Sequence, residues 1–337
     1  MNTRWVRLKS FLTVLLATLV TACVASPTAL PSLTPTRRAT RTPTPTPTLT
    51  PTLTPTPIRA EPRALRGDLA NQINNMEEAM PTAGSERFVI PTEVEKAAFA
   101  ELVTRLMGGE TAWAGGLAAQ NGYELLAYTD RGDGNAKSWI LRELKPTRKG
   151  WGLYVFRAKP LNEIIIEAPH PLADEGTPSV ALAMYRALHA RALSIAGAHR
   201  RANADGSADA AHTTQSVFES VHEALTEAGT PIVLQIHGFA SGKHPGYPQI
   251  ILSHDLGVET DLLDELSAAL TAQGLTVGVC DGAKWQALCG ETNVQSWHIA
   301  DGLFIHFELD ETVRSDDQRL LAALALVFKC GGACTQR

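Results

Sequence analysis

The stretch Glu163-Ile-Ile-Ile-Glu-Ala-Pro-His170-Pro-Leu-Ala-Asp-Glu175-Gly-Thr177 places a histidine and two carboxylates just behind an apolar run. A run such as Ile164–Ile166 is typical of a buried strand. The four residues between His170 and Glu175 let both side chains reach one divalent ion, with Asp174 as a rival ligand. The alternative is that His170 is an ordinary loop residue and Glu175 the acidic start of the next helix, which the helix dipole favours.

Apolar runs and helical patterns alternate over much of the chain. Strands are expected at 163–167, 193–198, 232–236, 249–253, 276–280 and 303–309, and helices at 177–192, 214–228, 261–273 and 315–328. Two earlier runs, 138–144 and 152–157, suggest an antiparallel pair. Because alternating strands and helices favour a parallel sheet covered by helices, the sequence predicts an α/β fold. Its central sheet is expected to be mixed, mostly parallel, with helices on both faces.

Three histidines follow expected strands of this sheet. His170, His199 and His237 each lie one or two residues past an apolar run. Ligands of open α/β sheets bind beyond the carboxyl ends of the parallel strands, so these imidazoles are expected at one rim. The Gly-x-Ser-x-Gly elbow of serine hydrolases does not occur in the sequence, which favours a metal site over a serine nucleophile.

A carboxylate that could act as a base lies on the last expected strand. Alternation places Phe304, His306 and Glu308 on one face of that strand. A carboxylate beside apolar residues tends to have a raised pKa, which suits a general base that takes a proton from water at a metal. The alternative is a strand-end glutamate in a salt bridge, for example with Arg314.

These residues together predict a catalytic zinc centre. Zinc favours nitrogen and carboxylate ligands and keeps one position open when the site is catalytic. The predicted ligands are His170, Glu175 and His237, and the predicted catalytic residue is Glu308.

A basic segment could bind the substrate. His199-Arg200-Arg201-Ala202-Asn203 follows an expected strand. Arg200 could clamp a carboxylate with two parallel hydrogen bonds. We therefore expect Arg200, with His199 and Asn203, to contact the substrate. The alternative is a solvated basic turn.

The order of these motifs resembles the zinc carboxypeptidase superfamily, in particular phage-type poly-γ-glutamate hydrolases and N-formylglutamate amidohydrolases. The segment from His170 to Thr177 looks like the His-x4-Glu-x-Gly-Thr segment of the first group, His237 matches the third ligand, and Phe307-Glu308-Leu309 looks like the segment with the catalytic glutamate. Two departures stand out. Other carboxypeptidases have two residues between the first histidine and the glutamate, and their substrate-binding Asn-Arg pair has no clear counterpart here.

The resemblance implies a zinc-dependent metallopeptidase or amidohydrolase that cleaves a peptide, γ-glutamyl or N-acyl amino acid bond. The alternative from another class is a non-catalytic surface lipoprotein that binds a metal, a peptide or a cell-wall fragment on the same fold. A third alternative is a metal-scavenging lipoprotein. That reading requires a closed site, with Asp174, His199 or His254 as the fourth ligand.

The N-terminus has the features of a targeting segment. Arg4, Arg7 and Lys9 precede the apolar stretch Phe11–Val20, which is short for a membrane span. Val20-Thr21-Ala22-Cys23 resembles the bacterial lipobox, which implies a signal peptide over 1–22, cleavage before Cys23 and lipidation of its sulfur. We therefore expect a lipid-anchored protein outside the cytoplasm. An ordinary signal peptide with an incidental cysteine is the alternative.

Composition divides the rest of the chain. Residues 23–57 are rich in Thr and Pro and are expected to form an extended linker. Residues 58–87 are polar and are expected to be poorly ordered, 88–329 form the predicted hydrolase-like domain, and 330–337 form a tail.

Charge and cysteine content limit the partners and the compartment. The net charge is −5 and the sequence has no dense Lys/Arg cluster, which argues against nucleic acid as the main partner. In an oxidising compartment the four remaining cysteines would pair most simply as Cys280–Cys289 and Cys330–Cys334.

Overall fold

The computed structural model describes residues 58–144, 148–227, 229–254, 260–280, 284–299 and 302–329. They belong to one compact unit, Pro55–Arg337. The expected signal peptide, Cys23, the expected linker, the expected tail and the expected Cys330–Cys334 pairing all lie outside the described residues. The Cys280–Cys289 disulfide is present. Within the described ranges, no helix is both long and apolar enough to cross a membrane.

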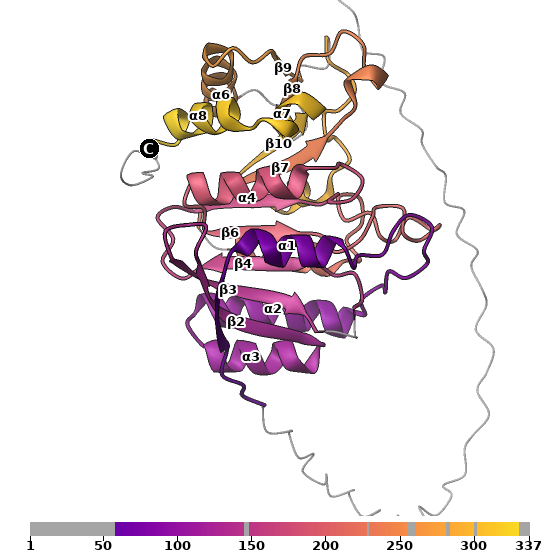
Figure 1. The fold of residues 1–337 in the computed structure, drawn as a ribbon. Coiled ribbons are helices and arrows are strands. Elements are labelled where there is room, and N and C mark those ends of the chain that lie inside the picture. The colour runs from indigo at the N-terminus through magenta and orange to yellow at the C-terminus, as the bar shows by residue number, and fades with distance from the viewer. Residues whose placement is uncertain are drawn as a thin grey trace, which may run out of the picture. The chain divides into compact units, whose positions relative to one another are not determined.

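A single sheet runs through the described part of the chain (Figure 1). Its strands are β1 Arg63–Gly67, β2 Tyr123–Asp130, β3 Ala136–Glu143, β4 Leu153–Arg157, β5 Ile164–Ala168, β6 Ala192–Ile195, β7 Ile232–Gly238, β8 Ile250–His254, β9 Val277–Val279 and β10 Leu303–Leu309. The order is β1-β2-β3-β4-β6-β5-β7-β10-β8-β9. The junctions β1–β2, β6–β5, β5–β7, β7–β10 and β8–β9 are parallel, and the other four are antiparallel. The predicted mixed, mostly parallel sheet is confirmed.

Helices cover both faces of this sheet, as predicted (Figure 1). They are α1 Leu69–Glu77, α2 Glu93–Met107, α3 Thr111–Gln120, α4 Thr177–Ala187, α5 Val217–Thr226, α6 Asp261–Ala272, α7 Glu311–Ser315 and α8 Gln318–Val327. Helices α1, α4, α6 and α8 contribute to one hydrophobic core, and α2, α3 and α5 to the other.

The apolar run of β5 is explained by these two cores. Ile164 and Ile166 belong to the core that contains α4, whereas Ile165 belongs to the core that contains α5. Successive side chains of a strand point to opposite faces, so a strand with a core on each face needs apolar residues without alternation. This double burial makes β5 a rigid base for the loop that carries His170.

The loop after β5 turns sharply into α4. Gly176 precedes the first residue of α4 and has a φ of 88°, a left-handed conformation that favours glycine. The helix expected from residue 177 therefore begins at Thr177, with Gly176 as its N-cap. The turn brings the start of α4 close to the end of β5.

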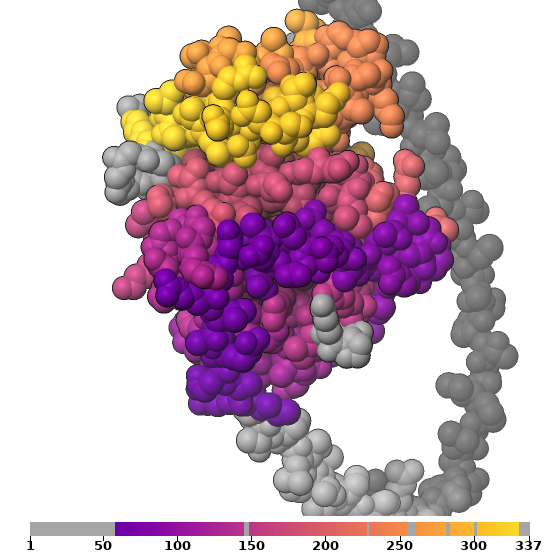
Figure 2. All heavy atoms as spheres, in the orientation of Figure 1, coloured from indigo at the N-terminus to yellow at the C-terminus, as the bar shows by residue number. Residues whose placement is uncertain are grey.

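The prediction that residues 58–87 are poorly ordered is wrong. Strand β1 pairs in parallel with β2, and α1 buries Leu69 and Ile73 in the core beside α4. Arg186 of α4 also forms an ion pair with Asp68, the N-cap of α1. Figure 2 shows these indigo residues lying on the same face as the yellow C-terminal helices. The segment has few apolar residues, and its order comes from partners distant in the sequence.

The loop after β6 depends on a close backbone approach that can be tested. A Cβ at Gly197 would clash with the backbone of Gly150 and Gly152. We predict that Gly197→Ala lowers the free energy of unfolding by about 1–3 kcal/mol, the usual cost of overpacking. Gly242→Ala, where a Cβ meets nothing within 4 Å, should change it by less than about 0.5 kcal/mol. Urea denaturation of both variants measures this, and equal stability would contradict the packing described.

Candidate metal centre

Three adjacent strands bring the candidate site together. β5, β7 and β10 lie side by side and run parallel, so their carboxyl ends meet at one edge of the sheet. His170 follows β5 by two residues, and His237 is near the end of β7. The register of β10 on β7 pairs Glu308 with His237. The structure therefore brings His170, His237 and Glu308 together at this edge.

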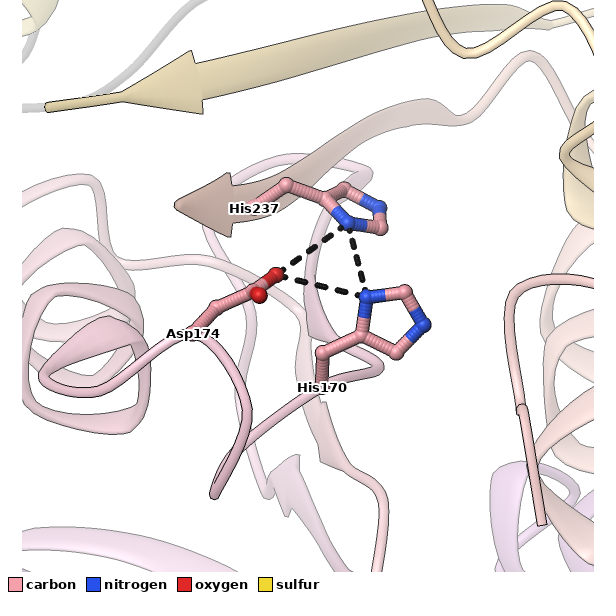
Figure 3. A group of neighbouring side chains, drawn as sticks. All are labelled: His170, Asp174 and His237. Carbon is pink, nitrogen blue, oxygen red and sulfur yellow. Dashed lines mark hydrogen bonds and ion pairs between the residues drawn. The ribbon is translucent and has the colours of Figure 1, made fainter. Parts of the chain in front are cut away.

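Three donor atoms converge at this edge (Figure 3). Nδ1 of His170 lies 3.1 Å from Nδ1 of His237. Oδ2 of Asp174 lies 3.3 Å from Nδ1 of His170 and 3.5 Å from Nδ1 of His237. The two imidazoles are buried, and the side chain of Asp174 is 11% exposed. The three atoms thus form a small triangle that is largely shielded from solvent.

The triangle has the dimensions of a zinc site. Ligand atoms about 2.0–2.2 Å from a tetrahedral zinc ion are about 3.3–3.6 Å from one another. Two Nδ1 atoms that face each other at 3.1 Å need a proton or a cation between them, because their lone pairs would otherwise repel. The donor set of two imidazoles and one carboxylate therefore fits zinc.

His170 is held from behind by a carboxylate. Its Nε2 lies 2.8 Å from Oδ1 of Asp209, and an acceptor there leaves Nδ1 to face the centre. Asp209 in turn accepts from Nε of Arg200 at 2.9 Å and contacts His212. Burial alone would lower the pKa of His170, but Asp174 and Asp209 outweigh it and raise that pKa. Burial alone would raise the pKa of Asp209, but its bonds to His170 and His212 lower it.

His237 is held by a neutral partner and stays uncharged. Its Nε2 lies 2.8 Å from Oε1 of Gln235. Burial is the main cause that lowers the pKa of His237, to about 4, and the nearby His170 lowers it further. Metal ligation requires a neutral imidazole, so this environment prepares His237 for it.

The prediction that Glu175 lies with the two histidines is contradicted, and Asp174 takes that place. The backbone N–H of Asp174 donates to the carbonyl of His170 at 2.9 Å, which forms one helical turn. Residues i and i+4 of such a turn share a side, whereas i+5 points elsewhere. The side chain of Glu175 is exposed and is absent from every candidate metal group in the described ranges.

Glu308 lies next to His237 with an unused oxygen. It is 8% exposed, and its Oε2 is without a hydrogen-bond partner among the described residues. Burial is the main cause that raises the pKa of Glu308 well above its usual value, and the charge of Asp174 adds to it. The suggested salt bridge to Arg314 is not formed, because that guanidinium donates to backbone carbonyls of Glu175, Phe239 and Leu309.

The three predicted substrate-binding residues have different placements. Arg200 is joined to the centre through Asp209, and its side chain is 33% exposed. Nδ1 of His199 accepts from the backbone of its own turn, at Arg201. Asn203 is engaged elsewhere, because its amide bonds to the backbone N–H and carbonyl of Phe88. Only Arg200 is thus linked to the candidate metal centre.

A buried polar group behind His237 was missed by the sequence analysis. It includes Glu167 on β5 and Gln235 on β7, both fully buried, and Asn293 and Gln295 from a later loop. The sequence does contain a sign of this buried group, because each apolar run includes one polar residue, as in Ile-Ile-Ile-Glu and Val-Leu-Gln-Ile. Polar side chains at such positions are costly unless bonded, which marks them for a specific role.

No family model matches the chain, and no curated protein sequence matches it. Similar solved structures include a bacteriophage poly-gamma-glutamate hydrolase (14% identity, TM-score 0.35, covering 52% of this chain and 87% of that chain). An N-formylglutamate amidohydrolase from Ralstonia eutropha JMP134 has 13% identity and a TM-score of 0.32, covering 52% and 96%. A metallo-carboxypeptidase from Burkholderia cenocepacia has 15% identity and a TM-score of 0.33, covering 72% and 70%. At such low identities, these structures are similar to this chain in fold alone.

Substitution of the two neighbouring carboxylates tests the ligand set. We predict that Asp174→Asn raises the zinc dissociation constant by about 100-fold or more, because loss of a direct ligand should exceed the 10–100-fold typical of outer partners. Glu175→Gln, with its exposed side chain, should leave the constant within about threefold. Competition with a chromogenic chelator on the full chain measures both. Weaker binding in Glu175→Gln alone would restore Glu175 as the ligand.

Proposed function

We propose that this protein is a zinc-dependent amide hydrolase that acts on a peptide, γ-glutamyl or N-acyl amino acid bond. The observation that carries the proposal is the triangle of His170, Asp174 and His237 beside Glu308, whose buried Oε2 has no partner within the described ranges. A metal site with a spare base at its side is the arrangement that metal-assisted hydrolysis requires.

Each side chain then has a defined task. His170, Asp174 and His237 would hold the ion, and a bound zinc ion would supply Lewis-acid activation of the amide carbonyl and of a water molecule. Glu308 accepts the proton of the attacking water and delivers it to the leaving nitrogen. The raised pKa of Glu308, caused first by burial, suits this task because a carboxylate with a raised pKa is a stronger base than an ordinary one.

Arg200 orients the substrate in this proposal. Its partly exposed guanidinium lies beside Asp209 at the edge of the centre, where it can also reach a carboxylate in solvent. A peptide C-terminus, a γ-glutamyl unit and an N-acyl amino acid all carry such a carboxylate close to the scissile amide. This shared chemistry supports these three substrate classes.

Removal of the base tests the proposed reaction. We predict that Glu308→Gln lowers kcat by about 100- to 10,000-fold, the usual contribution of a general base, with zinc still bound. Glu223→Gln, which changes a half-exposed carboxylate outside the centre, should keep wild-type activity. Hydrolysis of a panel of γ-glutamyl, peptidyl and N-acyl amino acid substrates is the readout. Full activity in Glu308→Gln would refute the mechanism. A zinc-loaded wild type that cleaves none of them would favour the non-catalytic surface protein.

We further propose that the protein works outside the cytoplasm, anchored to the membrane through a lipid on Cys23. The lipobox-like Val20-Thr21-Ala22-Cys23 supports the anchor. The Cys280–Cys289 disulfide supports an oxidising compartment, because structural disulfides are rare in the cytosol.

Substitution of the lipidation site tests the anchor. The wild-type protein should fractionate with membranes, and mass spectrometry should find its N-terminus at a modified Cys23. Cys23→Ala should abolish the modification and release the chain from the membrane fraction. An unprocessed wild-type N-terminus in the cytosolic fraction would contradict this location.

A further inference from the structure

The side chain of Gln235 uses all of its hydrogen-bonding capacity behind His237. It is fully buried on β7. Its Oε1 accepts from Nε2 of His237 at 2.8 Å and from the amide of Asn293. Its Nε2 donates to Oε2 of Glu167 at 2.8 Å and to Oε1 of Gln295 at 3.2 Å. An amide offers two donors and two acceptor positions, so every one is occupied.

The orientation of this amide follows from Glu167. The carboxylate of Glu167 accepts hydrogen bonds, and its other oxygen already bonds to Nδ1 of His222 at 2.8 Å. The NH2 group of Gln235 must therefore face Glu167, and its oxygen must face His237. Since an oxygen can only accept, Nε2 of His237 must carry the hydrogen, and Nδ1 keeps its lone pair.

We propose that Glu167 and Gln235 are a positioning pair that fixes the tautomer of His237. Neither residue is among the donors that converge at the centre; Glu167 acts on Gln235, and Gln235 acts on the imidazole. The register of β5 on β7 pairs Glu167 with Gln235, so the sheet itself sets their alignment. The tautomer of His237 does not depend on the proposed zinc site, and only its consequence rests on that proposal. With the hydrogen on Nε2, the lone pair on Nδ1 of His237 is directed toward Nδ1 of His170 and Oδ2 of Asp174, where zinc would bind.

The cost of this pair argues for a task beyond packing. Both residues lie in central strands whose other buried positions, apart from His237 itself, are Ile, Val, Leu and Ala. Burying a carboxylate and an amide there is less favourable than burying two aliphatic side chains of similar size. In the other tautomer of His237, the N–H would point into the triangle of donors and exclude a cation from it.

Four variants of the full chain separate tautomer control from stability. Gln235→Leu removes the acceptor. Glu167→Gln removes the group that orients Gln235. The double variant Gln235→Glu/Glu167→Gln exchanges the two groups and again places an acceptor on His237. The control Gln295→Leu also removes a buried bond to Gln235, but it leaves Glu167 in place.

Two readouts are needed. Nitrogen-15 spectra of the histidine side chains report which nitrogen of His237 carries the hydrogen in the metal-free protein. A pH near 7.5 is suitable because it lies above the ordinary pKa of an imidazole, about 6.5, so a neutral ring is observed. Competition with a chromogenic chelator gives the zinc dissociation constant independently of any activity.

The inference predicts the hydrogen of His237 on Nε2 in the wild type and the control. Gln235→Leu should give a mixture of tautomers and weaken zinc binding by about 10–100-fold, the typical effect of an outer-shell partner. Glu167→Gln should have a smaller effect in the same direction, and the double variant should restore the wild-type tautomer. Gln295→Leu should lower the melting temperature without changing tautomer or affinity.

A wild-type hydrogen on Nδ1 would overturn the inference, as would a Gln295→Leu variant that loses zinc affinity as strongly as Gln235→Leu. A wild type that binds no zinc would sink the proposed function instead, while the spectra of the metal-free protein would still decide the tautomer.

Discussion

The lone pairs of two buried imidazoles are directed at each other, and the rest of the site is organised around this constraint. His170 and His237 bring their Nδ1 atoms to 3.1 Å, with a carboxylate oxygen of Asp174 close to both. Such a triangle is stable only when a proton or a cation lies within it. Asp174 and Asp209 raise the pKa of His170 against the effect of burial, which favours a proton on that imidazole when no metal is bound. A metal ion would replace that proton.

Two side chains outside the triangle orient the imidazoles so that these lone pairs stay directed inward. Asp209 holds the far nitrogen of His170, and Gln235 holds the far nitrogen of His237. The two partners differ in a useful way. A carboxylate behind His170 favours its charged form, whereas a neutral amide behind a fully buried His237 leaves burial as the main influence, so that imidazole stays neutral. One histidine can therefore carry the proton while the other accepts it.

The fold and the histidine positions could be predicted from the sequence because they follow from periodicity and from the geometry of parallel sheets. The unbroken run Ile164–Ile166 signals a strand buried on both faces. His237 and Glu308 each lie near the end of a parallel strand, and adjacent strands bring such residues together. The distance from His170 did not separate Asp174 from Glu175, because that choice depends on a single helical turn after His170. One further signal was available. The segment that His170–Thr177 resembles has one residue between its carboxylate and Gly-Thr, and this spacing fits Asp174 before Gly176-Thr177 rather than Glu175. The order of residues 58–87 was not predictable, since β1 and α1 are stabilised by β2 and α4, which lie far along the chain.

The location of a bound zinc ion tests this account most directly. Anomalous X-ray diffraction at the zinc absorption edge, on crystals of the protein grown with zinc, would place the ion relative to its ligands. The account predicts one strong peak about 2.0–2.2 Å from Nδ1 of His170, Nδ1 of His237 and a carboxylate oxygen of Asp174. No peak there, or an ion bound through Nε2 of either histidine, would contradict it.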